Sequence, residues 1–194
     1  MTTGIVIAAA GRGERFSQAG GEGNKLNAEF ADQSGRRRSL FEQTLRQALA
    51  SGLPVWVVTR PDNLQVQQVC AAYQVPVTLL ASASLGDSIT AGVKATPHWQ
   101  GWLIHLADMP FVTPGVFQQV AAALSQHAIV RPSFQQQPGH PVGFSALLRK
   151  QLGQLRGDNG ARELLKGQSV YLLSLDQPTV VQDIDLPSQL PASE

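Results

Sequence analysis

The chain has 194 residues, a length typical of one domain that can bury a full hydrophobic core. Hydrophobic residues make up 43% of it and charged residues 15%, which excludes the charge-rich composition of a disordered chain. Fifteen lysines and arginines against fourteen acids leave a formal charge of +1, so electrostatics give no reason to expect a nucleic acid or a membrane as partner.

The ends and the single cysteine are unremarkable in sequence. The N-terminus lacks a basic start followed by a long apolar core, and no apolar run approaches the roughly eighteen residues that span a bilayer. We therefore expect a cytoplasmic protein with one domain over residues 1–194. Cys70 cannot form an internal disulfide and lies in a segment typical of a helix, so we expect it to be structural.

Short apolar segments alternate with segments of helical periodicity along most of the chain. We predict strands at 4–10, 55–59, 77–80 and 102–107, and helices at 39–49, 63–73, 87–95 and 114–125. Beyond residue 132 the alternation loosens, with helices expected at 145–152 and 161–165 and late strands at 170–173 and 180–185. The pattern predicts an α/β fold with a mostly parallel sheet and helices on both faces. We expect the less regular second half of the chain to cover the ligand-binding site of this fold.

A glycine-rich loop follows the first predicted strand directly, and its residues are Ala9, Ala10, Gly11, Arg12 and Gly13. The dinucleotide-binding fingerprint needs a third glycine where this chain has Phe16, and no Walker pattern surrounds Lys25. Such a loop can still hold phosphates through its backbone N–H groups, with positive charge from Arg12, Arg15 and Lys25. A tight turn with solvated basic residues is the alternative.

Aspartates follow two of the predicted strands. Asp108 comes directly after the strand at 102–107, at the carboxyl edge where open α/β sheets bind ligands. Asp183 and Asp185 lie in the late strand, where alternation puts them on the same face. Because Mg²⁺ takes one or two carboxylates together with phosphates, acids from the two strands could meet over one ion. The alternatives are that Asp108 caps the helix after Pro110 and that Asp185 is a solvated acid.

Three further segments carry candidate binding residues. Asp87 and Ser88 lie at a helix start, where they could cap the helix or bind the edge of a base. His140 lies in the turn Pro138-Gly139-His140-Pro141, which we expect to be rigid and exposed. The histidine could have a functional role or could be part of a plain turn. Arg162 follows a glycine-containing turn and could hold an anion or lie on a capped surface helix.

Taken together, these segments resemble the MobA-like nucleotidyltransferase family, and within it most closely the molybdenum cofactor cytidylyltransferases. The family opens with a strand and the pattern Ala-Ala-Gly-x-[Ser/Gly]-x-Arg-[Met/Phe]-Gly, with a lysine shortly after. Residues 9–16 fit it, while Ser17 replaces the last glycine and a longer loop precedes the lysine, here Lys25. The resemblance continues in order over nearly the whole chain, through residues 39–41, 86–88, 107–110, 138–141, 157–162 and 183–187.

The resemblance implies a single Rossmann-like domain of the nucleotide-diphospho-sugar transferase type. It implies transfer of CMP from CTP to a phosphorylated acceptor, with molybdopterin cofactor favoured, release of pyrophosphate, and a molybdoenzyme as recipient of the product. Carried over to this chain, it has the loop around Gly11 hold the triphosphate, Arg15 and Lys25 neutralise it, and Asp108 with Asp185 bind Mg²⁺.

Two expectations extend this assignment. The pair Asp87 and Ser88 resembles the helix start of the cytidylyltransferases of isoprenoid synthesis, which contact cytosine near the serine, so we include both in the nucleotide site. His140 and Arg162 are expected to face the acceptor.

The alternatives to CMP transfer to molybdopterin are guanylyl transfer to molybdopterin, cytidylyl transfer to a sugar- or alcohol-phosphate, and a nucleotide- or cofactor-binding module without catalysis. The acids Asp108 and Asp185 at distant strand ends disfavour the last of these.

Overall fold

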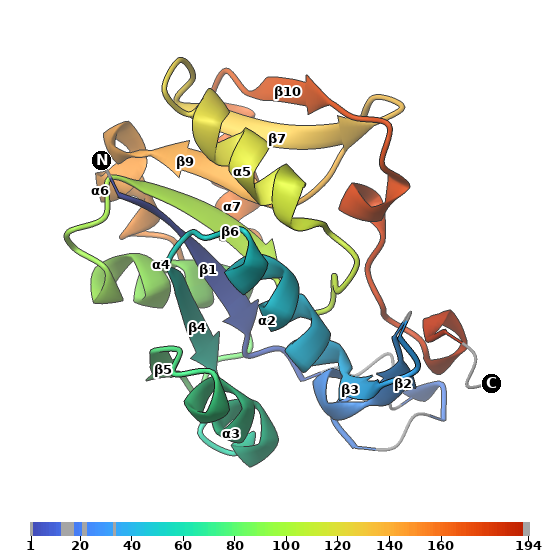
Figure 1. Ribbon diagram of the computed structural model, residues 1–194. Coiled ribbons are helices and arrows are strands. Elements are labelled where there is room, and N and C mark those ends of the chain that lie inside the picture. Colours follow the sequence, from blue (N-terminus) through green and yellow to red (C-terminus); the bar gives the residue numbers. More distant parts are fainter. Residues whose placement is uncertain (1, 13–17, 21–22, 33, 192–194) are drawn as a thin grey trace.

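The computed structural model describes residues 2–12, 18–20, 23–32 and 34–191, and in them one twisted sheet lies between two layers of helices (Figure 1). The strands are β1 (Thr3–Ala9), β2 (Glu29–Ala31), β3 (Arg37–Ser39), β4 (Val55–Thr59), β5 (Val77–Leu79), β6 (Gly101–Leu106), β7 (Ile129–Phe134), β8 (Gln137–Pro138), β9 (Val142–Ser145) and β10 (Tyr171–Ser174). The main sheet has the order β10-β7-β9-β6-β1-β4-β5, with β8 beside β7, while β2 and β3 form a separate hairpin.

The centre of the sheet is parallel, as predicted. Strand β1 pairs in parallel with β4 and β6, and β4 pairs in parallel with β5. Strand β9 runs antiparallel to both β6 and β7, so the sheet is mixed at that side. Because Ala8 is opposite Leu106 and the Ala107 N–H donates to the Ala8 carbonyl, β1 and β6 end side by side. The fold thereby brings the glycine-rich loop next to Asp108.

Helices cover both faces of the sheet, which confirms the predicted layering (Figure 1). They are α2 (Leu40–Ala50), α3 (Leu64–Ala72) and α5 (Pro114–Ala123) on one face, and α4 (Leu85–Ala95), α6 (Arg149–Leu152) and α7 (Gly160–Lys166) on the other. Strand β1 is buried on both faces, with Ile5 and Ile7 toward one layer and Val6 toward the other. Helix α4 approaches Val6 so closely that a Cβ at Gly92 would overlap it. The continuous apolar run of β1 follows from this double burial.

Most predicted elements shift by one or two residues at an end, and two differences, at the start of α4 and before α6, have a local cause. Helix α4 begins at Leu85 rather than at 87, because the side chain of Ser84 accepts from the Asp87 N–H and caps it. The helix predicted at 145–152 is divided into the 3-10 turn η2 (Ala146–Leu148) and α6. Cys70 is buried in α3, which confirms its structural role. Among the described residues, no helix is long and apolar enough to cross a membrane.

The strand predicted at 180–185 is wrong. Residues 178–189, which we call the C-terminal strap, start with the 3-10 turn η3 (Pro178–Val181) and end with η4 (Pro187–Gln189). Pro178 favours a turn here, and the Val180 carbonyl accepts from the His140 N–H rather than from a neighbouring strand. Val180 and Ile184 are buried in the core between the sheet and α2 and α5. The strap therefore lies along the body of the domain without joining the sheet.

Candidate nucleotide and metal site

A pocket of about 190 Å³ opens where β1 and β6 end. It is lined by Ala8, Ala9, Ala10, Gly11, Lys25, Leu26, Ala83, Leu85, Ser88, Leu106, Ala107 and Asp108. The structure thus brings together six residues that the sequence assigned to the nucleotide or the metal, namely Ala9, Ala10, Gly11, Lys25, Ser88 and Asp108. This edge of a parallel sheet is where open α/β folds bind ligands.

Two buried threonine hydroxyls fix the strand ends that form the pocket floor. Thr59 donates to the carbonyl of Ala9 over 2.9 Å, and Thr44 donates to the carbonyl of Ala107 over 2.7 Å. At Gly11 no described atom lies within 4 Å of the position that a Cβ would take, so the described residues leave this part of the loop backbone open. Arg12 is exposed and is not among the lining residues. Gly13 and Arg15 lie outside the described residues.

Lys25 links the loop side of the pocket to the acids. It starts the 3-10 turn η1 (Lys25–Asn27), which the Asn24 side chain caps by accepting from the Leu26 N–H. Its ammonium nitrogen lies 2.9 Å from Oδ2 of Asp108 and 3.1 Å from Oδ1 of Asp185. Burial acts to lower the pKa of Lys25, but Asp108 and Asp185 outweigh it and the pKa is raised. Lys25 is therefore held as a cation between the two carboxylates.

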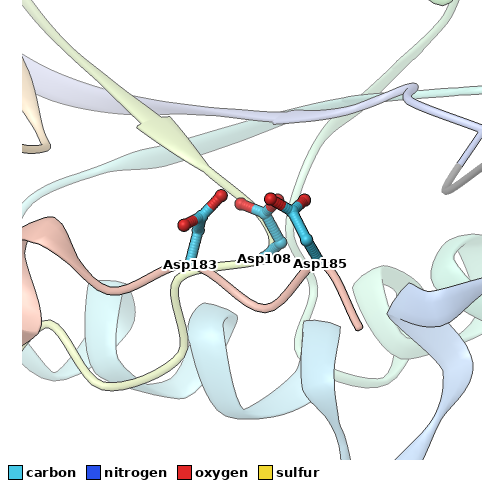
Figure 2. A group of neighbouring side chains, drawn as sticks. All are labelled: Asp108, Asp183 and Asp185. Atoms are coloured by element: carbon cyan, nitrogen blue, oxygen red, sulfur yellow. The ribbon is translucent and has the colours of Figure 1, made fainter. Parts of the chain in front are cut away.

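Three carboxylates converge beside the pocket, and one of them, Asp108, lines it. Asp108, Asp183 and Asp185 each place an oxygen within 4.8 Å of the other two, and Figure 2 shows the three side chains directed into one space. Asp108 does not cap α5, because that helix begins at Pro114 after Thr113. Although Asp183 and Asp185 are not on a strand, the Ile184 N–H between them donates to the Asp108 carbonyl over 2.9 Å. Both acids of the strap lie close to Asp108, so Asp183 as well as Asp185 is a candidate metal ligand.

The electrostatics of the cluster show an excess of buried negative charge. Burial raises the pKa of Asp108, although Lys25 acts against it. The pKa of Asp183 is raised by burial, then by its hydrogen bond with Asp185 and by the charges of Asp108 and Asp185. Within the described residues, Oδ1 of Asp108 is buried and has no hydrogen-bond partner. Each of these features would be relieved by a further cation.

The donor set fits a hard divalent cation. Mg²⁺ and Mn²⁺ prefer carboxylate oxygens, and Mg²⁺ keeps several waters and takes the rest of its ligands from substrate phosphates. Three converging carboxylates and the unpartnered oxygen of Asp108 supply such ligands beside a pocket open to a nucleotide. The residues present are therefore compatible with a metal that both the protein and a triphosphate would hold.

The start of α4 separates the roles of Asp87 and Ser88. Ser88 is 2% exposed and is one of the residues that line the pocket. The Asp87 carboxylate accepts from the Ser82 hydroxyl over 2.6 Å, and the hydrogen bonds from Ser82 and Ser84 lower its pKa. Asp87 is not among the residues that line the pocket. Its contacts stabilise the turn before α4.

The two residues expected to face the acceptor lie outside the pocket lining. His140 is half-buried rather than exposed, because its backbone is bonded to the strap at Val180. Burial, followed by the charges of Arg131 and His105, lowers the pKa of His140 to about 3, so the ring is neutral at physiological pH. Arg162 is exposed on α7. Their contact with an acceptor stays a prediction.

Sequence inspection missed the residues that hold the site in place. Thr44 lies in the helix predicted at 39–49, where no role was expected of it, yet its hydroxyl donates to the Ala107 carbonyl at the strand end. Gln189 accepts from the backbone of Asp185 and Leu186 with its side chain, 2.7 Å in each case. A polar residue on the buried face of the α2 helix was a usable signal for Thr44. Nothing in the local pattern distinguishes Gln189 from other polar residues near the C-terminus.

A pocket at the carboxyl edge of a parallel sheet, lined by Lys25 and by Asp108, which two further carboxylates approach, defines an α/β protein with a ligand site at that edge and a candidate divalent-metal site beside it. Comparison with known families makes this class specific. Residues 5–178 match the model of the MobA-like NTP transferase domain. The chain belongs to this family and is a nucleotidyltransferase.

Individual relatives agree with this placement. The chain is 27% identical over 199 residues to the purine catabolism protein PucB of Bacillus subtilis strain 168, covering 95% of this chain and 92% of that protein. Rv0371c of Mycobacterium tuberculosis H37Rv has the same fold, with a TM-score of 0.81 and 22% identity over 97% of this chain and 95% of that one. Rv0371c has also been solved with manganese, and that structure has a TM-score of 0.78 and 21% identity over the same shares. A nucleotidyl transferase of Methanothermobacter, Mth528, gives a TM-score of 0.78 and 24% identity over 97% of this chain and 94% of its own.

Proposed function

We propose that this nucleotidyltransferase moves CMP from CTP to a phosphorylated acceptor, with molybdopterin cofactor as the acceptor, and releases pyrophosphate. The convergence of Lys25 with Asp108 and Asp185 beside the pocket carries the proposal, because it places a cation-binding group of carboxylates next to an open cavity at the ligand-binding edge of the sheet. The ordered motifs that resemble molybdenum cofactor cytidylyltransferases support the choice of acceptor.

The lining of the pocket supports a bound nucleotide. Small side chains such as Ala8, Ala83 and Ser88 lie along its walls. The Ser88 hydroxyl is the buried polar group of α4 in that lining, and a hydroxyl can donate to or accept from the edge of a base. We therefore assign Ser88 to the base or the sugar, and Ala9, Ala10 and Gly11 to the phosphates.

The reaction needs no nucleophile from the protein. An ionised oxygen of the acceptor's terminal phosphate attacks the α-phosphorus of CTP and forms a new P–O bond. The bond from the α-phosphorus to the oxygen that bridges to the β-phosphate breaks, and pyrophosphate leaves with that electron pair. Catalysis of this kind rests on positioning and on stabilising the charge that builds on the phosphates.

We assign Mg²⁺ to Asp108 and Asp185, with Asp183 as a third carboxylate within reach. When bound, the ion supplies charge neutralisation for the phosphate oxygens. Lys25, already held as a cation beside the acids, would stabilise the departing pyrophosphate together with Arg15. On the strength of the resemblance we further assign His140 and Arg162 to the acceptor and propose a molybdoenzyme as recipient of the product. The protein itself is proposed to be cytoplasmic.

The proposal is tested by offering the protein each of the four ribonucleoside triphosphates with Mg²⁺, with and without molybdenum cofactor. Pyrophosphate release and the mass of the product are measured. We expect release with CTP that depends on the acceptor, together with a cytidylylated cofactor. Preference for GTP would move the assignment to guanylyl transfer, product formation with a sugar- or alcohol-phosphate would replace the acceptor, and CTP binding without any turnover would leave a binding module.

A further inference from the structure

The C-terminal strap carries Asp183 and Asp185, two of the three carboxylates of the cluster, yet the described part of it pairs with no strand of the sheet. Its position must therefore come from other contacts. Two groups of contacts hold it against the rest of the domain, one at Val180 and one at Ile184, and a third group around Gln189 shapes the strap from within. They lie before, between and after the two acids.

The first contact depends on the absence of a side chain at Gly139. A Cβ at this position would overlap the carbonyl oxygen of Val180 and would lie 2.6 Å from the carbonyl carbon. Because both obstructing atoms belong to the backbone, no rotamer change could relieve the overlap. The same Val180 carbonyl accepts from the His140 N–H over 2.9 Å, so any displacement of Val180 also breaks that bond. The strap can approach this closely only at a glycine.

The third contact fixes the backbone beside Asp185. Oε1 of Gln189 accepts from the N–H groups of Asp185 and Leu186, and Nε2 donates to the Asp183 carbonyl over 3.4 Å. One exposed amide side chain thus bonds to the backbone of both metal-site acids. Between them, Ile184 is 4% exposed and its N–H bonds to the Asp108 carbonyl.

We propose that Gly139 and Gln189 are positioning residues that hold the C-terminal strap so that Asp183 and Asp185 meet Asp108, and that they set the affinity of the site for a divalent cation. The inference rests on the proposed function, since it takes the three carboxylates as the metal site. In this proposal Gly139 and His140 act through their backbone contacts with Val180, independently of any contact of the His140 ring. Groups that orient metal ligands typically contribute about 10- to 100-fold to metal affinity.

Manganese alone is the probe, and its binding to the whole protein is followed by electron paramagnetic resonance of the free ion. We expect Gly139→Ala and Gln189→Ala each to weaken Mn²⁺ binding by about tenfold or more. The matched controls are Gly115→Ala, where a Cβ meets no described atom within 4 Å, and Gln168→Ala at an exposed residue. Both controls should bind Mn²⁺ like the unchanged protein.

Two companion measurements separate the possible failures. Hydrogen exchange at the Ile184 amide should be faster in both variants, because its bond to Asp108 depends on the strap. A loss of thermal stability with unchanged Mn²⁺ affinity and unchanged exchange at Ile184 would mean a merely structural role and would overturn the inference. Asp108→Asn tests the metal site itself: if it binds Mn²⁺ as tightly as the unchanged protein, the proposed function fails at that point, independently of Gly139 and Gln189. Because Gln189 is exposed, its variant decides the question even if Gly139→Ala does not fold.

Discussion

The ammonium nitrogen of Lys25 lies 2.9 Å from Oδ2 of Asp108, although 82 residues separate the two in the chain. Both side chains are largely buried, with 13% and 17% of their surface exposed. Among the described residues, Lys25 supplies the positive charge that pairs with Asp108 and Asp185. We expect a divalent ion to take over this neutralisation and to let Lys25 turn toward the phosphates.

Replacing the lysine tests this exchange of cations. In Lys25→Gln the carboxylates of Asp108 and Asp185 lose their charged partner, and leaving a buried charged group unsatisfied costs about 1–3 kcal/mol. We expect a lower melting temperature in chelator, restored by Mg²⁺ to a greater extent than in the unchanged protein, and slower turnover. Calorimetry with and without Mg²⁺ measures the first effect. An equal response of both proteins to Mg²⁺ would show that Lys25 and the ion do not substitute for one another.

Asp108→Asn should remove activity while keeping the fold. The buried Asp108 carboxylate has a raised pKa, so its charge costs stability and its loss should leave the melting temperature unchanged or higher. Loss of a metal ligand should lower kcat by roughly two orders of magnitude or more. Asp62→Asn, at an aspartate whose side chain is 75% exposed, is the control. Turnover of Asp108→Asn near the normal rate would remove this residue from the site.

Ser88→Ala should affect nucleotide recognition rather than chemistry. The buried hydroxyl lines the pocket, and one hydrogen bond is worth about 1 kcal/mol, so KM for CTP should rise roughly fivefold with little change in kcat. Preference for CTP over UTP and GTP should fall if the hydroxyl contacts the base. Ser125→Ala, on the exposed end after α5, should behave like the unchanged protein. A kcat effect without a KM effect would assign Ser88 to another role.

Most of the fold was predictable because the double burial of strands such as β1 leaves a continuous apolar run in the sequence. Asp108 was predictable for a related reason, since an acid directly after a central parallel strand lies at the ligand-binding edge. The strap was not: Val180, Ile184 and their polar neighbours alternate as in a strand, but their carbonyl and N–H groups bond to His140 and Asp108 instead of to a sheet. Such contacts join residues far apart in the chain and leave no periodic pattern.

His105 gives a pH-dependent contribution to stability with a definite sign. Burial lowers its pKa to about 4, against about 6.5 in an unfolded chain. Below pH 6.5 the unfolded state therefore binds a proton that the folded state does not, so the stability contribution is complete above about pH 6.5 and is lost as the pH falls toward 4. The slope for one such histidine approaches about 1.4 kcal/mol per pH unit.

Denaturant unfolding of the protein and of His105→Gln between pH 7 and pH 5 measures this contribution. The variant should show a shallower loss of stability with falling pH, because one titrating group is gone. His98→Gln, at an exposed histidine, serves as the control and should keep the slope of the unchanged protein. The same slope in His105→Gln would contradict the assignment of the proton uptake to His105.

The fate of labelled phosphorus shows directly whether nucleotidyl transfer occurs beside the pocket where Lys25 meets Asp108. CTP labelled at the α-phosphorus or at the γ-phosphorus is incubated with Mg²⁺, molybdenum cofactor and either the unchanged protein or Asp108→Asn. The α-label should move to the acceptor and the γ-label to pyrophosphate, and neither should move with the variant. Transfer of the γ-label to the acceptor, or α-label transfer that survives in Asp108→Asn, would contradict the account.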